Sequence, residues 1–315
     1  MNATDHSPPL RNVSDTALWV AMYRAMESER PDALFDDPLA RRMAGARGDA
    51  IVRNMPAAQE IAGPMTVRTA VIDELVLRCI EQGACTVINL GAGLDTRAFR
   101  LALPAAVHWI DVDLPDMVAH RRKCLGGAEA NWRHSHMVAD VGDALAVEAV
   151  LSLARRTWGP VVVLTEGLMV YLTEHQVVRL AGQLYDEPQV AWWIGDLISP
   201  ALCATSGSLW QSQLTPDATF QFAPRDRAGF FARLGWQERE FRSTWDESIR
   251  LKRPASWAAW WTIFGQPHFH SAHESLRQSS GVSLFEARCH SALPSSVARQ
   301  GGKAARAACD HALAR

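Results

Sequence analysis

The sequence predicts an α/β fold in which a mostly parallel, doubly wound sheet is covered by helices on both faces. In the middle of the chain, short apolar stretches alternate with stretches of helical period, at the spacing of strand–helix–strand units. The short stretches are apolar almost throughout, as strands buried on both faces are. The first of them, TVINL, leads through the glycines of GAG into a helix. These observations favour one large parallel sheet with right-handed crossovers.

The individual elements follow from the same periodicity. Strands are expected at 86–90, 107–112, 135–138, 161–165 and 190–195, with helices between them near 96–102, 115–125, 144–155 and 174–185. Beyond residue 225 the chain predicts a helix that stops at Gly235, a strand at 236–241 and an aromatic helix at 251–264. No convincing final antiparallel strand pair follows, although 281–289 (GVSLFEARC) could supply a last strand.

The regions outside this alternation are expected to surround it. An N-terminal helical cap is expected over 14–65, with helices from Ser14 and over 34–45, and a third helix is expected after it, from about 66 to 82. Residues 198–224 break the pattern and are interpreted as a lid inserted over the carboxyl ends of the strands. Residues 1–13 and 266–315 are expected to be tails, the first disordered and the second largely mobile, which leaves one domain over 14–265.

Composition excludes several classes of protein. The 315 residues are 48% hydrophobic and 21% charged, with a net charge of −2, so no overall positive field would attract nucleic acid. No apolar run approaches the roughly 20 residues that cross a bilayer, and the N-terminus lacks the apolar core of a signal peptide. We therefore expect a cytoplasmic protein without nucleic-acid or membrane partners. The sequence does not indicate an oligomeric state.

Cysteine, histidine and tryptophan each leave a choice of interpretation. The six cysteines show no CxxC and no repeated spacing, which favours reduced thiols over disulfides or zinc ligands. His268, His270 and His273 have no accompanying carboxylate or cysteine cluster, so a solvated segment is favoured over a metal site. The twelve tryptophans are interpreted mainly as core, with an aromatic wall around an apolar substrate as the alternative.

The loop after the first strand indicates the cofactor. Gly91 and Gly93 let the backbone pass close to a ligand. A dinucleotide fold has a third glycine for the pyrophosphate-binding helix, and Thr96 stands at that position here. A cofactor with adenosine but no pyrophosphate, namely S-adenosylmethionine, fits this loop. Taken alone, the loop is equally consistent with a tight strand-to-helix turn.

Acidic side chains end the second strand. Asp111 and Asp113 come 20 and 22 residues after Gly91, where a carboxylate can accept hydrogen bonds from both ribose hydroxyls. Asp113 lies at the strand-to-helix junction and is the better candidate. Asp111 either supports it or points to the other face. Capping the next helix is a compatible role for Asp113.

Two later strands also end in acidic residues. Asp140 could contact the adenine amino group, with Val141 offering its backbone N–H, although Asp140 or Asp143 could instead only cap the next helix. Glu166 follows the almost wholly apolar strand VVVLT, where a carboxylate is costly unless a cation pairs with it. The sulfonium and ammonium groups of the cofactor would supply that charge. A structural ion pair is the alternative.

Taken in order, these motifs resemble the leucine carboxyl methyltransferase family, and within it a bacterial branch similar to tetracenomycin-type polyketide carboxyl O-methyltransferases. The resemblance rests on Thr66–Arg68, NLGAGLDTRAFRL, DVDLPDMVAHRR, LTEGLMVYL and the N-terminal ALWVAMYRAMESERPDALFDDPLARRM. It covers about residues 14 to 245 and implies a Rossmann-like fold that binds S-adenosylmethionine.

The resemblance also implies roles for single residues. Arg68 would pair with the carboxylate of the cofactor, and Gly91 and Gly93 would pass under its methionine part. Tyr171 would face the substrate and is the candidate catalytic residue. The three carboxylates would lie at the ribose, the adenine and the amino group, in the order Asp113, Asp140 and Glu166. No metal is expected.

The expected reaction is therefore O-methylation of a small, polyketide-like molecule. A carboxylate acceptor is already ionised and needs no general base, which suits a chain without a Ser-His-Asp or Cys-His signature; a hydroxyl acceptor would need a base. The alternatives are an NAD(P)-dependent dehydrogenase and a non-catalytic S-adenosylmethionine-binding protein.

Overall fold

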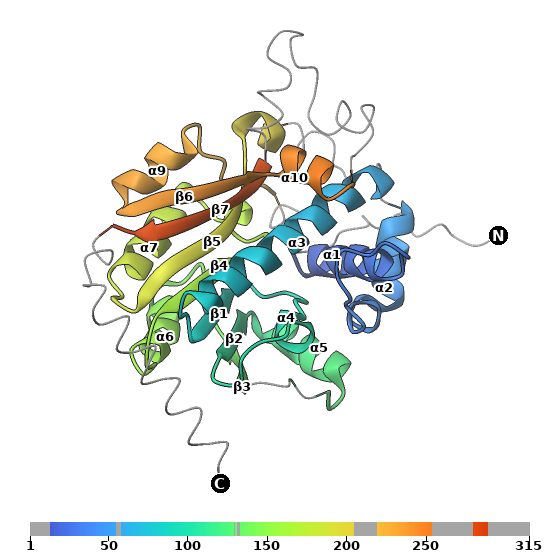
Figure 1. Cartoon of the computed structure of the whole chain (residues 1–315), viewed down its shortest axis with the longest axis horizontal. Helices are drawn as coiled ribbons and strands as arrows, with labels where there is room; N and C mark the ends of the chain where they lie inside the picture. Colours follow the sequence, from blue (N-terminus) through green and yellow to red (C-terminus); the bar gives the residue numbers. More distant parts are fainter. Residues whose placement is uncertain are drawn as a thin grey trace, which may run out of the picture.

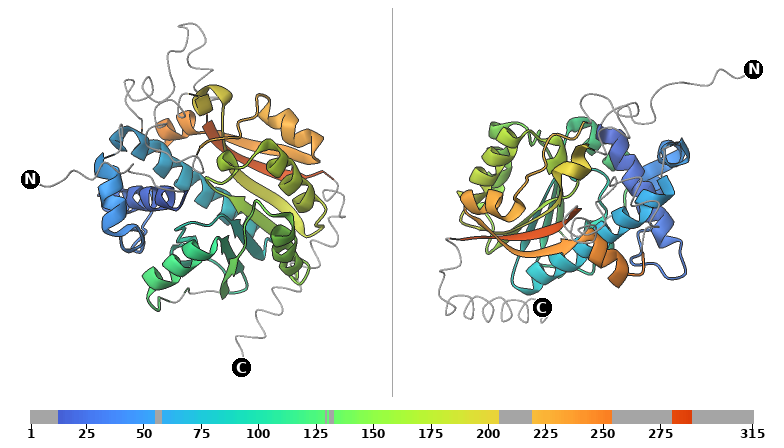
Figure 2. Two further views of the ribbon diagram at one scale, coloured as in Figure 1. Left: turned by 180° about the vertical axis from the view of Figure 1, so that it is seen from behind. Right: turned by 90° about the horizontal axis from the view of Figure 1, so that it is seen from above.

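The computed structural model describes residues 13–54, 58–128, 130, 133–204, 219–253 and 280–288. In this part of the chain, one sheet runs in the order β3-β2-β1-β4-β5-β7-β6, with helices on both faces (Figures 1 and 2). Its strands are β1 (Thr86–Leu90), β2 (His108–Asp113), β3 (Arg133–Val138), β4 (Val161–Thr165), β5 (Val190–Ile198), β6 (Trp236–Ser243) and β7 (Ser280–Ala287). The helices are α1 (Val13–Ser28), α2 (Ala40–Asn54), α3 (Ala58–Glu81), α4 (Arg97–Arg100), α5 (Pro115–Leu125), α6 (Ala144–Ala154), α7 (Glu174–Tyr185), α9 (Arg227–Arg233) and α10 (Thr244–Arg250), with a 3-10 turn, η1 (Met169–Tyr171), after β4.

The strand order creates the crevice that holds the site. Strands β1 to β5 are parallel, and the chain moves outward from β1 to β2 and β3 before it returns to β4 and β5 on the other side of β1. The loops after β1 and β4 therefore leave the sheet in opposite directions, and ligands bind at such a point, beyond the carboxyl ends of the strands. The predicted doubly wound, Rossmann-like fold is confirmed.

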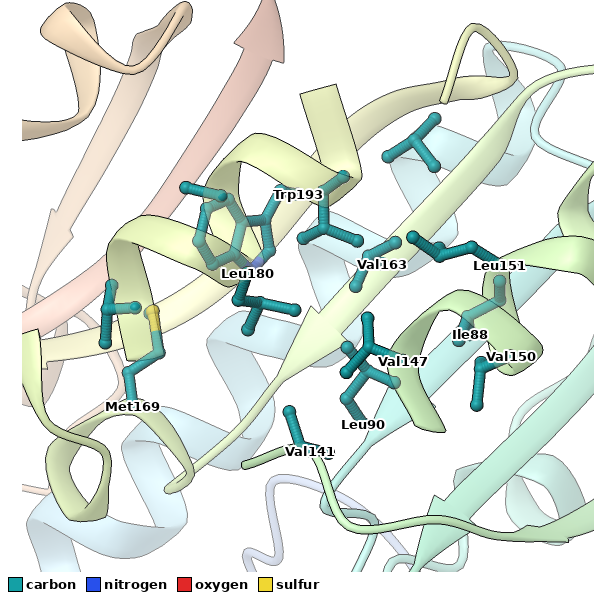
Figure 3. Packing of buried hydrophobic residues seen from close by; sticks show 14 of the residues in the cluster. Ile88, Leu90, Val141, Val147, Val150, Leu151, Val163, Met169, Leu180 and Trp193 are labelled. Carbon is teal, nitrogen blue, oxygen red and sulfur yellow. The ribbon is translucent and has the colours of Figure 1, made fainter. Parts of the chain in front are cut away.

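Side chains on the two faces of the sheet pack against the two layers of helices. Odd and even positions face opposite sides, and two buried hydrophobic clusters result. The cluster on one face joins the strands to α3 and includes Val87, Trp109, Val162 and Ile194. The other joins them to α6 and α7 and includes Ile88, Val147, Val163, Leu180 and Trp193 (Figure 3). Each fully buried side chain of this kind contributes about 1.5–3 kcal/mol, so these two clusters fix the sheet under the site.

Strand β7 confirms the last strand suggested at 281–289 and corrects the expectation of a tail over the same residues. It lies between β5 and β6 and is antiparallel to both, with Phe285 opposite Trp193 and Glu238. The interpretation of 266–315 as a largely mobile tail is therefore wrong for residues 280–287, and the domain does not end at 265. Phe285 is fully buried against Phe231 and Trp193, so β7 completes the core. Most of the expected aromatic helix at 251–264, and the histidines at 268–273, lie outside the described residues.

The N-terminal helices differ from the prediction in their bounds. Helices α1 and α2 pack together beside the N-terminal half of α3 (Figure 1). Helix α2 begins six residues later than predicted and continues through a kink at Gly45, whose φ is 57°. Helix α3 begins eight residues earlier than predicted, because Pro64 lies inside the helix without ending it. The expected boundary of the helical cap at 65 therefore falls within a helix.

The described residues also bear on the remaining expectations. Cys79, Cys85, Cys124 and Cys203 are all free thiols. Trp109, Trp193 and Trp236 are fully buried, which confirms the core interpretation for these tryptophans. No helix in the described ranges combines the length and the apolar character that a membrane crossing requires.

Candidate cofactor and acceptor site

A cavity of about 310 Å³ lies at the carboxyl ends of the parallel strands. It is bordered by the residues that follow β1, β2, β3 and β4, by the last residues of β5, and by side chains of α1 and α3. The predicted residues that line it are Arg68, Gly91, Gly93, Asp113, Asp140, Val141, Glu166 and Tyr171. The fold therefore brings together all of the predicted site residues except Asp111.

The backbone of the glycine loop borders the cavity, as its sequence indicated. Gly91 and Gly93 have φ values of 63° and 51°, in the left-handed region that favours glycine. Asp95 accepts the backbone N–H of Arg97 at 2.8 Å, so the start of α4 is already satisfied by a carboxylate. Thr96 is buried, and its hydroxyl donates to Asp37 at 2.6 Å. This one-turn helix does not present a free N-terminus to a pyrophosphate.

Asp113 lies beside this loop, at the end of β2. Its Oδ2 accepts the Gly93 N–H at 2.5 Å, and its Oδ1 accepts the Leu114 N–H at 2.7 Å. Burial raises the pKa of the Asp113 carboxyl, and these two N–H groups and Arg121 act in the opposite direction. Backbone N–H groups thus hold Asp113 at the cavity wall. Among the described residues, no arginine or lysine donates a hydrogen bond to it.

Asp111 is the correction to the predicted site. It is almost fully buried on β2 and lies outside the cavity lining. Its Oδ2 lies 2.5 Å from Arg121 Nη2 and 2.7 Å from His134 Nε2. Its Oδ1 accepts from Asn89 and Trp109, each at 2.9 Å. Because side chains alternate along a strand, Asp111 and Asp113 share a face, but only the terminal residue reaches the crevice.

Two acidic residues that follow β3, Asp140 and Asp143, have different roles. Asp143 caps α6 by accepting the Leu145 N–H at 3.0 Å. Asp140 does not cap the helix; it accepts the Gly142 N–H at 2.7 Å and lines the cavity beside Val141. The alternative of a helix cap therefore holds for Asp143, and Asp140 remains available at the cavity.

Arg68 and Glu166 meet at the opposite end of the cavity. Arg68 Nε lies 3.1 Å from Glu166 Oε1, and Arg68 Nη1 donates to Asp196 at 2.8 Å. Asp196 also accepts the Gly167 N–H at 2.6 Å. Burial opposes ionisation of Glu166, but Arg97 and Arg68 hold its pKa below the ordinary value. The structural ion pair that was the alternative for Glu166 is therefore present.

Arg97 is the principal residue that sequence reasoning missed. Its guanidinium is buried and contacts Asp73, Asp95 and Glu166 at 2.6, 2.7 and 2.5 Å. Asp95, Glu166 and Asp196 line the cavity. Arg97 stands in the helical stretch TRAFR of the quoted motif, and an arginine on an otherwise buried one-turn helix was the available signal.

Tyr171 marks the boundary between the charged end and an apolar wall. It is the last residue of η1, and its ring meets Phe220 edge-on at 5.4 Å between centroids. Burial raises the pKa of its phenol, while a hydrogen bond with Thr16 and the charge of Arg68 lower it. The phenol therefore stays protonated at neutral pH and can donate a hydrogen bond.

The cavity fits the amino-acid end of S-adenosylmethionine in its chemistry. Arg68 Nε and Glu166 Oε1 are buried and form an ion pair at 3.1 Å, and neither atom has a well-aligned hydrogen bond among the described residues. Buried polar atoms usually have such bonds in folded proteins. A carboxylate and an ammonium group arriving together would satisfy an arginine and a glutamate in this state.

Comparison with known proteins agrees with this site. The family model for leucine carboxyl methyltransferases matches residues 17–185. A protein from Parafrankia sp. is 39% identical over 185 residues, which are 56% of this chain and 59% of that protein. A protein from Frankia alni is 30% identical over 277 residues, which are 80% of this chain and 93% of that protein. Both are named, provisionally, as S-adenosyl-L-methionine-dependent methyltransferases.

Solved structures share the fold at low identity. A DUF574 family protein from Streptomyces avermitilis is 13% identical with a TM-score of 0.52, covering 85% of this chain and 96% of its own. A provisionally named methyltransferase from Thermobifida fusca is 14% identical with a TM-score of 0.50, covering 90% and 96%.

The sheet, the cavity and these relatives define an S-adenosylmethionine-dependent methyltransferase. The chain belongs to the leucine carboxyl methyltransferase family. The dehydrogenase and the non-catalytic binding protein are set aside.

Proposed function

We propose that this enzyme transfers the methyl group of S-adenosylmethionine to a carboxylate of a small molecule with an apolar, polyketide-like body. One observation carries the choice of a carboxylate: the described residues that line the cavity include no histidine, lysine or cysteine. These are three of the side chains that most often remove a proton from an acceptor hydroxyl or amine. A carboxylate is ionised at neutral pH and needs no such group.

Three other titratable side chains of the cavity, Tyr171, Glu166 and Asp113, are poorly suited to remove a proton from an acceptor. The Tyr171 phenol is neutral at neutral pH because burial raises its pKa. Glu166 is a weak base because Arg97 and Arg68, acting against burial, hold its pKa low. Asp113 already accepts two backbone N–H groups. An uncharged hydroxyl acceptor would therefore lack an effective proton acceptor among these side chains.

The charged side chains support the orientation of the cofactor. Five carboxylates and two guanidinium groups line the cavity, which suits a cation: Arg24, Arg68, Asp95, Asp113, Asp140, Glu166 and Asp196. Arg68 and Glu166 would hold the amino-acid end, Asp113 the ribose, and Asp140 with Val141 the adenine. When bound, S-adenosylmethionine supplies an electrophilic methyl group on its sulfonium.

The cavity also has apolar lining residues, called here the apolar wall, which support the proposed body of the acceptor. This wall consists of Trp19, Val20, Ile61, Pro64, Met65, Val170, Ile198, Leu202, Phe220 and Phe222. Several of these belong to a hydrophobic cluster of their own between α1, α2 and α3. A carboxylate drawn against this wall loses water, which increases its reactivity, and correct alignment with the methyl group is worth up to about 7–11 kcal/mol.

The type of bond that the methyl group forms, an ester or an ether, distinguishes a carboxylate acceptor from a hydroxyl acceptor. Benzoic, naphthoic and anthraquinone carboxylic acids should be incubated with methyl-labelled S-adenosylmethionine, beside matched alcohols and phenols of the same ring systems. A methyl ester releases labelled methanol in mild base, whereas methyl ethers and methylamines do not. Base-labile label from the acids alone is the expected result. Base-stable label from the phenols would replace the carboxylate by a hydroxyl acceptor.

A further inference from the structure

The backbone of Gly93 is held by hydrogen bonds at both its N–H and its carbonyl group. Its N–H donates to Asp113 Oδ2 at 2.5 Å, and its carbonyl accepts from Arg121 Nη1 at 2.9 Å. A glycine with left-handed φ has many other conformations open to it, so these two bonds select one. Asp113 lies in the cavity wall, but Arg121 reaches the loop from α5, behind it.

Asp111 determines where the guanidinium of Arg121 lies. The Arg121 side chain is completely buried, and Nη2 contacts Asp111 Oδ2 at 2.5 Å. Nη1 of the same planar group then points at the Gly93 carbonyl. A guanidinium can bind two partners at a fixed angle in this way, and lysine cannot.

A second arm runs from Asp111 to the cavity through Asn89. The amide nitrogen of Asn89 donates to Asp111 Oδ1 at 2.9 Å and to Asp95 Oδ2 at 3.0 Å. Asn89 and Asp95 both line the cavity. Asp111 thus does not line the cavity. It contacts Asn89, which does, and Arg121, which bonds to the loop that does.

We propose that Asp111 is a positioning residue for cofactor binding, which acts through Arg121 on the Gly93 carbonyl. The proposal requires that the cavity binds the cofactor and is independent of the identity of the acceptor. The sequence alone left open whether Asp111 supports Asp113 or points to the other face, and this proposal favours a supporting role that acts through Arg121.

A metal site is the competing explanation for this cluster. One ligand atom each of Asp111, His134 and His136 lies within 4.8 Å of the others. However, Asp111 already accepts four donors, and one of them is the cation Arg121. A divalent ion beside a buried guanidinium would be repelled, so the positioning role is favoured.

The test compares two single variants with their combination. Arg121→Lys keeps a cation for Asp111 but cannot also reach Gly93, and Asp111→Asn removes the charge that orients Arg121. Each should weaken binding of S-adenosylhomocysteine and of methylthioadenosine by about 10–100-fold. Both probes should lose the same factor, because they share the ribose. Binding is measured by calorimetry at a temperature where circular dichroism shows each variant folded.

The double variant separates positioning from a general loss of stability. An asparagine at position 111 keeps an oxygen that can accept from Asn89. If Asp111 acts through Arg121, Asp111→Asn in the Arg121→Lys background should therefore weaken binding little further. The control pair, Glu27→Gln and Arg253→Lys, breaks an ion pair that is similarly buried, with atoms 2.7 Å apart, and should leave both affinities unchanged.

Two results would overturn the proposal. One is wild-type affinity in folded Asp111→Asn, or losses that simply add in the double variant. The other is calorimetric binding of one equivalent of ZnCl₂ that His136→Ala abolishes, because the cluster would then be a metal site.

Discussion

Arg97 Nη1 lies 2.5 Å from Glu166 Oε2, beneath the charged end of the cavity. The Arg97 side chain is 1% exposed and that of Glu166 is 12% exposed. The cation that a carboxylate at the end of β4 requires is therefore supplied by the protein, and Arg68 adds a second. Glu166 can be ionised before any cofactor arrives, so the cavity keeps its charge pattern in the free enzyme.

Removing Arg97 should destabilise the fold strongly. Arg97→Met would leave Asp73, Asp95 and Glu166 without their shared cation, and breaking a buried ion pair on one side costs about 3–5 kcal/mol. Urea unfolding measures this loss. Arg41→Met is the control, because Arg41 and its partner Glu29 are both about half exposed, and it should cost less than about 1 kcal/mol. Similar losses in both variants would contradict a central role for Arg97.

Arg68 and Glu166 should govern recognition of the amino-acid end of the cofactor. Arg68→Lys loses the paired hydrogen bonds that an arginine gives a carboxylate, and Glu166→Gln removes charge with little change of shape. Both variants should lose their preference for S-adenosylhomocysteine over methylthioadenosine, which lacks the amino-acid end. Competitive binding of the two compounds measures that preference.

Because Arg68 and Glu166 also contact each other, both variants should melt at a lower temperature without ligand. The melting temperature alone therefore does not test cofactor recognition. A wild-type preference between the two compounds in both variants would remove these residues from the binding site.

Asp113 should contribute to affinity and little to folding. Asp113→Ala removes the carboxylate proposed to accept both ribose hydroxyls, which should weaken S-adenosylhomocysteine binding by about 2–4 kcal/mol. The melting temperature of the free enzyme should change little, since burial already disfavours the charged form. Thermal unfolding and calorimetry measure the two quantities. Unchanged affinity would exclude Asp113 from the ribose site.

The pH dependence of stability should show Glu166 and Asp113 acting in opposite directions. Burial opposes ionisation of Glu166, but Arg97 and Arg68 set its pKa below 4.5. Its contribution is therefore present above that pH and is lost as the pH falls through the folded pKa. Burial raises the pKa of Asp113 above 3.8. Its contribution is present below that pH and is lost as the pH rises through the folded pKa.

Urea unfolding from about pH 3 to pH 7 would resolve the two effects. Glu166→Gln should flatten the loss of stability on the acid side, because it removes a group that loses its ion pairs there. Asp113→Asn should steepen the same loss, because it removes a group that gains on protonation. The same pH slope in the wild type and both variants would refute these assignments.

The sequence predicted the parallel half of the fold and most of the cavity because both depend on local signals. An apolar strand, a glycine turn and an acidic residue at the strand end recur within a few residues, and parallel strands bring their carboxyl ends to one edge. Asp113, Asp140 and Glu166 were found in this way, and all three line the cavity.

The parts that were missed depend on distant partners. A last strand at 281–289 was suggested by its apolar residues, but its central place was not, because that depends on pairing with β5 and β6. Asp113 was favoured over Asp111 from its place at the end of the strand, but the contacts of Asp111 with Arg121 and His134 could not be predicted, because those partners lie elsewhere in the chain. Arg97 and Glu166 are 69 residues apart, and no local pattern links their charges.

The position of β7 also sets the order in which the molecule can be built. During synthesis β5 and β6 leave the ribosome before the strand that belongs between them, and β6 pairs only with β7 in the described sheet. Until residue 287 emerges, one side of β5 is an open edge with unpaired backbone groups, and such edges recruit strands of other chains. The nascent enzyme is therefore most prone to association late in translation, when the parallel half is already in place.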